Sequence, residues 1–220
     1  MVNQVVSRRN LHLPRKGRVG NLDIMTAQDR SMSKNTHCFD HASSEHTDTV
    51  LDIVKGYLRE NSQIKRVLVA TTEGSTGAKA AELFSDSDVI VVTHMTGFSE
   101  PNKNELKPSN REKIEENGAE ILTTTHALAG IARSFRKQLG TWTATELMAV
   151  AFRTFGQGTK VCAEIALMAA DAGLARVDED VICIGGTGRG ADTAWVIQPA
   201  NTSAFPDLKM RCCLCKPRDF

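Results

Sequence analysis

The residues best suited to chemistry in this 220-residue sequence lie directly after short apolar runs. The first group follows residues 67–70 and comprises Thr71, Thr72, Glu73, Gly74, Ser75, Thr76 and Gly77. Glycine permits a left-handed backbone, and Ser75 or Thr76 is the expected N-cap of the alanine-rich helix that follows. Such a turn directs unpaired N–H groups and a helix dipole at one spot, which suits phosphate. An ordinary strand-to-helix turn that binds nothing has the same pattern, so both interpretations stay open for this turn alone.

Two Thr-His pairs form the second and third groups. They comprise Thr93, His94, Gly97 and Phe98 after one apolar run, and Thr125 and His126 after the next. Histidine donates hydrogen bonds to phosphate or acts as acid or base near neutral pH. A single such histidine is more typical of a turn, but two at equivalent positions favour a site, because sites collect in loops on a rigid scaffold.

The fourth group is a glycine-rich loop after residues 181–184. It comprises Gly185, Gly186, Thr187, Gly188, Arg189, Asp192 and Thr193. The loop lacks the lysine and spacing of a P-loop and does not match the dinucleotide fingerprint. Arg189 is either a fork-shaped donor to phosphate or a solvated loop residue. Asp192 is expected to brace the loop through its side chain.

Lys160 follows the sequence Gly-Gln-Gly-Thr, which opens a helix. A lysine at the positive end of a helix is electrostatically misplaced, which indicates an anionic ligand or a carboxylate partner. The alternative, a lysine that reaches into water, is slightly favoured.

The elements that position these groups alternate between strand and helix. Buried strands are predicted at residues 67–70, 88–93, 119–125 and 181–184, and helices at 47–61, 75–84, 109–117, about 130–137, 143–155 and 159–172. Late strands at 194–198 and 208–214 are expected to be antiparallel at one edge. This order predicts a three-layer α/β/α fold with a mostly parallel sheet. The four polar groups then meet at the carboxyl edge of the sheet, where such folds bind ligands.

The amino-acid composition limits the classes of partner that we expect for this protein. The formal net charge is +1, and 41% of residues are hydrophobic and 24% charged, which is ordinary for a globular domain. No apolar run is long enough to span a bilayer, and no secretory signal is visible, so we expect no membrane partner. Of the six cysteines, Cys212, Cys213 and Cys215 crowd the last strand, which would place Cys213 and Cys215 on one face and Cys212 on the other. A reduced, cytoplasmic protein without a metal site is the simpler interpretation.

Residues 1–36 differ from the rest of the chain. They are rich in arginine and poor in apolar residues, which predicts a disordered basic extension. No aromatic residue is interleaved, so a nucleic-acid arm is not expected. A start of translation at Met32 is the alternative. Residues 37–220 are then the folded domain.

Two segments resemble a known domain. The stretch RVLVATTEGSTGAKAAELF, followed by DVIVVTH, resembles the opening of the pyruvate kinase C-terminal domain, and DEDVICIGGTGRGADTAWVI resembles its final strand, effector loop and hairpin strand. Glu73 stands where that enzyme has a small hydroxyl residue. A stand-alone archaeal and bacterial family similar to that domain is a closer match, through THALAG, FGQGTKV, MAADAG and GGTGRGADTA. The resemblance spans residues 34–217, and such proteins begin near His37, in agreement with a start at Met32.

The resemblance implies a binding role and excludes one activity. In pyruvate kinase this domain is regulatory, and in some versions the first turn holds the sugar phosphate of an activator. The catalytic barrel is absent here, so the chain is not expected to be a pyruvate kinase. Flavin mononucleotide (FMN) is the ligand associated with the stand-alone fold, and Ser75 and Thr76 match the positions that would hold its phosphate.

Three functions follow as hypotheses. The first is binding of a phosphorylated small molecule, with FMN as the first choice, by the four polar groups. The second is an enzyme, isomerase-like or flavin-dependent, in which His94 or His126 is the acid or base and Arg189 stabilises negative charge. The third is a regulatory module that binds a partner protein without a ligand. Self-association is compatible with each.

Overall fold

The computed structural model describes residues 36–220. The predicted basic extension, apart from Thr36, and the alternative start at Met32 lie outside the described residues. The helices are α1 (Thr47–Glu60), α2 (Ser75–Leu83), α3 (Pro108–Glu116), α4 (Gly130–Leu139), α5 (Ala144–Arg153) and α6 (Gln157–Asp171), with 3-10 turns η2 (Ser44–His46) and η3 (Thr202–Asp207). The strands are β1 (His37–His41), β2 (Arg66–Thr71), β3 (Asp88–Thr93), β4 (Glu120–Thr123), β5 (Val181–Gly185), β6 (Thr193–Gln198) and β7 (Lys209–Asp219).

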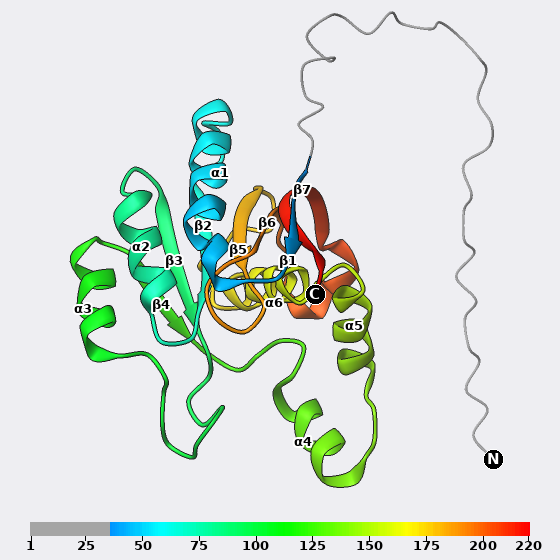
Figure 1. The fold of residues 1–220 in the computed structure, drawn as a ribbon. Coiled ribbons are helices and arrows are strands. Elements are labelled where there is room, and N and C mark those ends of the chain that lie inside the picture. The colour runs from blue at the N-terminus through cyan, green and yellow to red at the C-terminus, as the bar shows by residue number, and fades with distance from the viewer. Residues whose placement is uncertain (1–35) are drawn as a thin grey trace, which may run out of the picture. The chain divides into compact units, whose positions relative to one another are not determined.

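All of the described strands form one sheet, in the order β1-β7-β6-β5-β2-β3-β4 (Figure 1). β6 pairs antiparallel with β5 and β7, and every other pairing is parallel. The predicted α/β fold with a mostly parallel sheet is therefore confirmed. The edge beyond β7 is β1, which was not predicted because Phe39 is its only buried residue.

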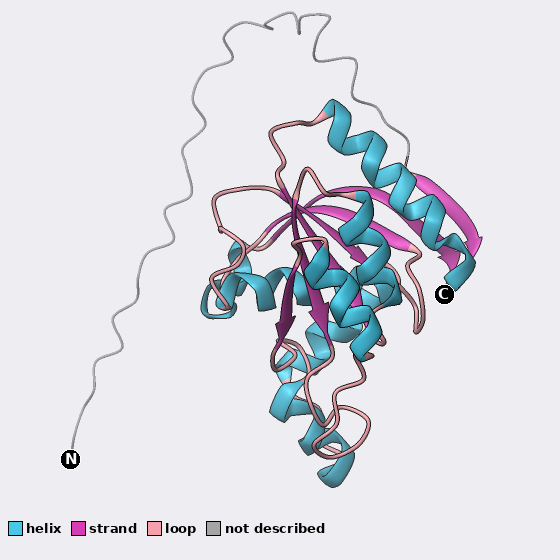
Figure 2. Ribbon diagram, turned by 90° about the vertical axis from the view of Figure 1, so that its left-hand side faces the viewer, coloured by secondary structure: helices cyan, strands magenta, loops and turns pink. Residues whose placement is uncertain are grey.

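Helices cover both faces of the sheet (Figure 2). α1, α2 and α3 bury residues such as Val54, Ala80 and Ile114 against the alternate side chains of β2, β3 and β5. α6 covers the opposite face, where Cys162 and Ala166 pack on Leu68 and Cys183. Both faces of the central strands are thus buried, which explains their continuous apolar runs.

The chain order creates a crevice between β2 and β5. The chain passes from β2 to β3 and β4 on one side, and β5 then pairs with the other side of β2. Strand order reverses at this point, because the loop after β2 leads to α2 and the loop after β5 leads to the neighbouring strand β6. The turn at residues 71–77 and the glycine-rich loop both start here.

Two predicted helix starts were wrong in detail. The N-cap of α2 is Gly74, with φ 100°, instead of Ser75 or Thr76. α1 begins at Thr47 as predicted, and the Thr47 hydroxyl donates to the Ser44 carbonyl and accepts from the Ala191 N–H. α6 begins at Gln157, before the predicted start, and the Thr159 hydroxyl donates to the Phe155 carbonyl.

Neither a membrane-spanning helix nor a metal cluster occurs in residues 36–220. None of the helices there is both long and apolar enough to cross a bilayer. The same residues contain no group of three or more His, Cys, Asp or Glu side chains placed to hold a metal ion. The six cysteines are free thiols, and Cys162 and Cys183 are buried in the core.

Candidate functional site

A cavity of about 580 Å³ lies at the carboxyl ends of the central strands. Residues from all four predicted groups line it: Thr71, Thr72, Ser75, Thr76, Thr93, His94, Phe98, His126, Gly186, Gly188 and Arg189. The prediction that the turns after the parallel strands meet at one edge is therefore confirmed. The volume of the cavity is typical of small-molecule sites.

The other predicted residues are not part of this lining: Gly74, Gly77, Gly97, Thr125, Gly185, Thr187, Asp192 and Thr193. A Cβ on Gly74 would lie 2.5 Å from Leu106 Cδ1, and one on Gly77 would lie 2.5 Å from Val91 Cγ1. These two glycines let the turn approach the loop before α3 and let α2 pack on β3. Their part in the site is to shape it.

Asp192 braces the glycine-rich loop, as predicted. It is buried, and its Oδ2 accepts a hydrogen bond of 3.0 Å from the Thr187 N–H. Its Oδ1 accepts one of 2.6 Å from the Thr193 hydroxyl. The loop is therefore held by side-chain bonds before any ligand binds.

The turn after β2 leaves backbone donors open. The Gly74 N–H donates to Thr71 Oγ1 at 3.1 Å, and the first helical bond of α2 runs from the Ala78 N–H to the Gly74 carbonyl. The N–H groups of Ser75, Thr76 and Gly77 precede that bond, and Gly74 has no side chain that could cap them. These groups form the positive end of α2, beside the cavity.

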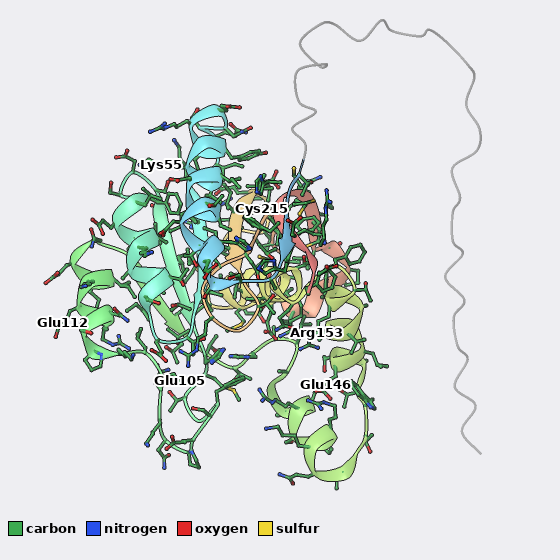
Figure 3. All side chains as sticks on the ribbon, in the orientation of Figure 1. Lys55, Glu105, Glu112, Glu146, Arg153 and Cys215 are labelled. Atoms are coloured by element: carbon green, nitrogen blue, oxygen red, sulfur yellow. The ribbon has the colours of Figure 1, made fainter. Side chains whose placement is uncertain are left out.

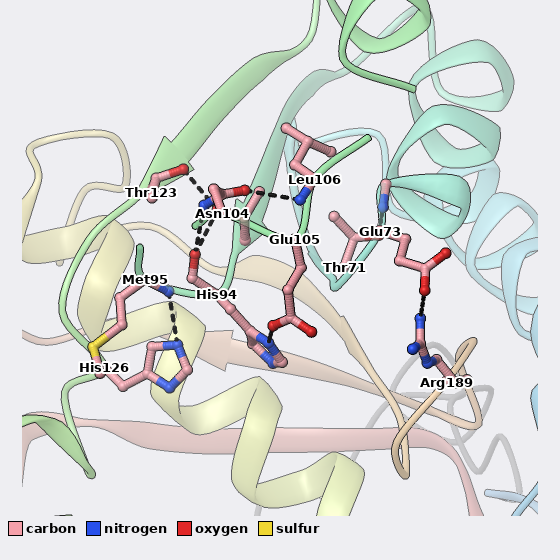
Figure 4. A network of polar contacts seen from close by, with 12 residues as sticks. Thr71, Glu73, His94, Met95, Asn104, Glu105, Leu106, Thr123, His126 and Arg189 are labelled. Atoms are coloured by element: carbon pink, nitrogen blue, oxygen red, sulfur yellow. Dashed lines mark hydrogen bonds and ion pairs between the residues drawn. The ribbon is translucent and has the colours of Figure 1, made fainter. Parts of the chain in front are cut away.

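Glu73 links this turn to the glycine-rich loop. Its carboxylate is paired with the Arg189 guanidinium (Figure 4). It is also paired with Lys107 Nζ, at 2.5 Å. Hydrogen bonds from Lys107 and Arg189 lower the pKa of Glu73. Arg189 is thus engaged by a carboxylate of the chain itself, at the place where a ligand anion would compete for it.

His94 is oriented by a carboxylate that the sequence did not reveal. Its Nδ1 donates to Glu105 Oε2 at 2.7 Å, and the His94 ring packs against Phe98 with 4.0 Å between ring centroids (Figure 4). Glu105 belongs to the polar loop before α3, and no spacing in the sequence links it to His94. With Nδ1 engaged as a donor, Nε2 is the remaining acceptor of a neutral ring.

His126 is held differently. Its Nε2 accepts from the Met95 N–H at 3.3 Å, and its Nδ1 lies 3.9 Å from Glu164 Oε2 (Figure 4). Burial lowers the pKa of His126 to about 4; the Glu164 carboxylate opposes this shift, and electrostatic interactions with His94, Lys160 and Arg133 add to it. The ring is therefore neutral at pH 7, and its acceptor nitrogen is used within the protein.

The position of Lys160 contradicts the sequence interpretation that its side chain reaches into water. It is buried on α6 and paired with Glu164 one turn later, and both line the cavity. Burial lowers the pKa of Lys160, against the effect of Glu164. Glu164 Oε1 also accepts from the Leu128 N–H at 3.0 Å. The i, i+4 spacing of lysine and glutamate is the signal that indicates this pair.

The opposite side of the cavity comes from α4 and α5. Arg136 Nε donates to Glu146 Oε1 at 2.7 Å, and Arg153 Nε donates to Gln157 Oε1 at 2.7 Å. The Arg133 guanidinium lies 4.3 Å from the centre of the Phe98 ring. These side chains were not predicted, because only the tertiary fold brings α4 and α5 to the sheet edge.

The charge of the cavity favours an anion. Five basic side chains and three glutamates line it, together with His94 and the neutral His126. Among the described residues, Arg133 and Arg153 form no ion pair with a carboxylate. No protein-family model matches the chain.

Proposed function

We propose that this protein binds a phosphorylated small molecule at the carboxyl edge of its sheet, with FMN as the first choice. The observation that carries the proposal is the set of open N–H groups at the start of α2, beside a cavity with a surplus of positive charge. Phosphate is the anion that most often uses such a helix start.

The phosphate would contact the N–H groups of residues 75–77 and the hydroxyls of Thr72, Ser75 and Thr76. Arg189 would donate to it from the glycine-rich loop, after exchanging the Glu73 carboxylate for a phosphate oxygen. Charge-assisted hydrogen bonds of this kind contribute about 1.5–3 kcal/mol each. Phe98 and Trp142, which also line the cavity, offer aromatic faces for the remainder of the ligand.

The likeness to the stand-alone relatives of the pyruvate kinase C-terminal domain is part of this proposal. The chain would bind such a ligand without transferring its phosphoryl group. The free cysteines fit a reducing compartment, and we propose the cytoplasm. We also propose that the chain binds neither nucleic acid nor a membrane. Self-association stays a prediction.

The test is titration of the purified protein with FMN, ribose 5-phosphate and inorganic phosphate. Ser75→Asp would place a carboxylate at the start of α2, where it repels phosphate yet complements the helix dipole. We expect it to abolish binding of all three probes without loss of thermal stability. Ser109→Asp, at the start of α3 and outside the cavity, is the matched control. Absence of binding to the unmodified protein would instead favour the ligand-free regulatory module.

A second function, an isomerase-like enzyme, is favoured by the His94–Glu105 pair. Glu105 fixes Nδ1 of His94 as the donor, which leaves Nε2 as a base that could take a proton from a carbon next to a carbonyl. His126 lacks a free acceptor nitrogen, so its role in such an enzyme would be to position Met95. Arg189 would stabilise the negative charge that develops on the carbonyl oxygen.

This second function has its own readout. Ribose 5-phosphate incubated with the protein in D2O would lose the proton next to its carbonyl, as followed by NMR. We expect His94→Ala to stop the exchange and Glu105→Gln to slow it. Exchange that is absent, or that survives His94→Ala, would contradict the proposed role of His94.

A further inference from the structure

Glu146 is a buried carboxylate on the wall of the cavity with only half of its hydrogen-bonding capacity used. The residue is 6% exposed, and its Oε1 accepts from Arg136 Nε at 2.7 Å. Its Oε2 is buried and has no hydrogen-bond partner in the protein. Figure 3 shows Glu146 on α5, where the chain turns back from α4. A buried carboxylate oxygen without a donor is costly, so a donor from outside the chain is needed here.

The cavity that Glu146 lines also contains flat aromatic and guanidinium groups. Arg136 lies with its guanidinium 5.4 Å from the centre of the Trp142 ring, and Arg133 lies 4.3 Å from that of Phe98. All four side chains line the same cavity as Glu146. Aromatic rings and guanidinium groups both stack on flat, conjugated ligands. A sugar or an aliphatic chain would use these faces poorly.

The charges that line the cavity limit the kind of ligand group that can donate a hydrogen bond to Glu146 Oε2. Arg133 and Arg136 disfavour a cationic ligand group, while the Glu146 and Glu164 carboxylates disfavour a second anion next to Oε2. A neutral N–H or O–H satisfies Oε2 without adding charge, and a ring N–H combines this with a flat face that stacks on the aromatic and guanidinium groups.

We propose that Glu146 Oε2 accepts a hydrogen bond from a ring N–H of a planar nitrogen heterocycle that stacks on the aromatic and guanidinium faces of this wall. The inference rests on the proposed phosphate site. It adds the chemical class of the part of the ligand that lies away from the phosphate. The imide N–H of a flavin or of a pyrimidinedione has this chemistry. The phosphate turn and Glu146 then recognise the two ends of one molecule.

The test compares each ring-bearing phosphate with its methylated form. FMN and uridine 5′-monophosphate are titrated with and without a methyl group on the imide nitrogen, and ribose 5-phosphate serves as the probe without a ring. For the unmodified protein we expect at least one of the two nucleotides to bind more tightly than ribose 5-phosphate. Methylation should weaken that binding about tenfold or more, because it leaves Oε2 without its donor.

Glu146→Gln is the matching protein variant. It keeps an oxygen for Arg136 and turns an N–H2 group toward the ligand N–H. We expect it to weaken binding of the unmethylated nucleotide about tenfold, to leave ribose 5-phosphate unchanged, and to remove most of the effect of methylation. Glu112→Gln on α3, outside the cavity, is the control and should change none of these.

Two outcomes would overturn the inference and leave the phosphate site standing. One is a nucleotide that binds no better than ribose 5-phosphate or tolerates methylation. The other is a Glu146→Gln variant that weakens ribose 5-phosphate as much as the nucleotide, because Glu146 would then act only through the fold. Failure of every probe, ribose 5-phosphate included, would remove the proposed function as well. The methylation experiment needs no variant, so misfolding of Glu146→Gln would not prevent a result.

Discussion

Helices α6 and α4 line the same cavity in opposite environments. Twelve of the fifteen residues of α6 are buried, whereas none of the ten residues of α4 is. α6 packs small side chains on the sheet, while α4 exposes Ile131, Phe135 and Leu139. The sheet-side wall is therefore part of the folding core. The wall from α4 and α5 supplies arginines and Glu146, and only Glu146 and Ala149 of these two helices are buried. We therefore expect most changes there to affect binding more than stability.

The most direct test of this contrast removes one leucine from each helix. Leu167 on α6 is 1% exposed and packs with Leu128 and Ala149, whereas Leu139 on α4 is 68% exposed. Leu167→Ala should destabilise the protein by about 2–5 kcal/mol, because it leaves a cavity in the core. Leu139→Ala should change stability by less than about 0.5 kcal/mol. Urea unfolding measures both, and equal losses would refute the contrast.

His126, on the sheet side of the cavity, makes the unfolding free energy of the protein depend on pH. Its pKa in the folded protein is about 4, below the ordinary 6.5, so the unfolded chain binds a proton more strongly between these values. The stability from the neutral, buried ring is complete above pH 6.5 and is lost as the pH falls toward 4. The loss amounts to about 3 kcal/mol at most.

Replacement of His126 checks this pH dependence. We expect His126→Gln, which keeps an acceptor for the Met95 N–H, to flatten unfolding free energy against pH between 4 and 6.5. His37→Gln on β1, where the side chain is exposed, is the control. An unchanged slope in His126→Gln would show that other groups produce the pH dependence.

The start of α6 allows a third test through close packing. A Cβ added to Gly158 would lie 2.5 Å from Thr193 Cβ and 2.8 Å from Asp192 Oδ1, whereas one on Gly56 of α1 meets nothing within 4 Å. Gly158→Ala should therefore cost about 1–3 kcal/mol. Gly56→Ala should stabilise α1 by about 0.5–1 kcal/mol, because alanine favours the helix. Thermal unfolding compares the two, and a neutral Gly158→Ala would mean that α6 can shift.

The sheet and the convergence of its turns could be predicted because buried parallel strands leave continuous apolar runs. The prediction for β3, residues 88–93, matches its observed bounds. β1 was missed because four of its five residues are exposed, so no apolar pattern distinguishes it from a loop. The capping residues were wrong because the choice between Gly74 and Ser75 depends on a positive φ that the tertiary packing imposes.

The residues of the site could be predicted only where they directly follow a strand in the sequence. Thr71, Thr93 and Gly185 end β2, β3 and β5, so the strand pattern alone leads to their neighbours. Glu105 and Glu146 are far from any strand, and their places beside His94 and Arg136 depend on how a long loop and two helices fold back. These two polar partners carry no local signal of this kind.

The smallest expected effect concerns Glu73, which pairs a sheet-side cation in the way that Glu146 pairs Arg136 on the other wall. Glu73→Ser frees Arg189 and removes a carboxylate beside the open N–H groups of α2, so inorganic phosphate should bind about two- to fivefold more tightly at low salt. The gain should shrink as salt screens the charges. Glu115→Ser breaks an Arg111 ion pair of 3.1 Å on α3 and should leave phosphate affinity unchanged. Weaker binding in Glu73→Ser would show instead that Glu73 holds Arg189 in its binding position, and the two walls would then use their glutamates for opposite purposes.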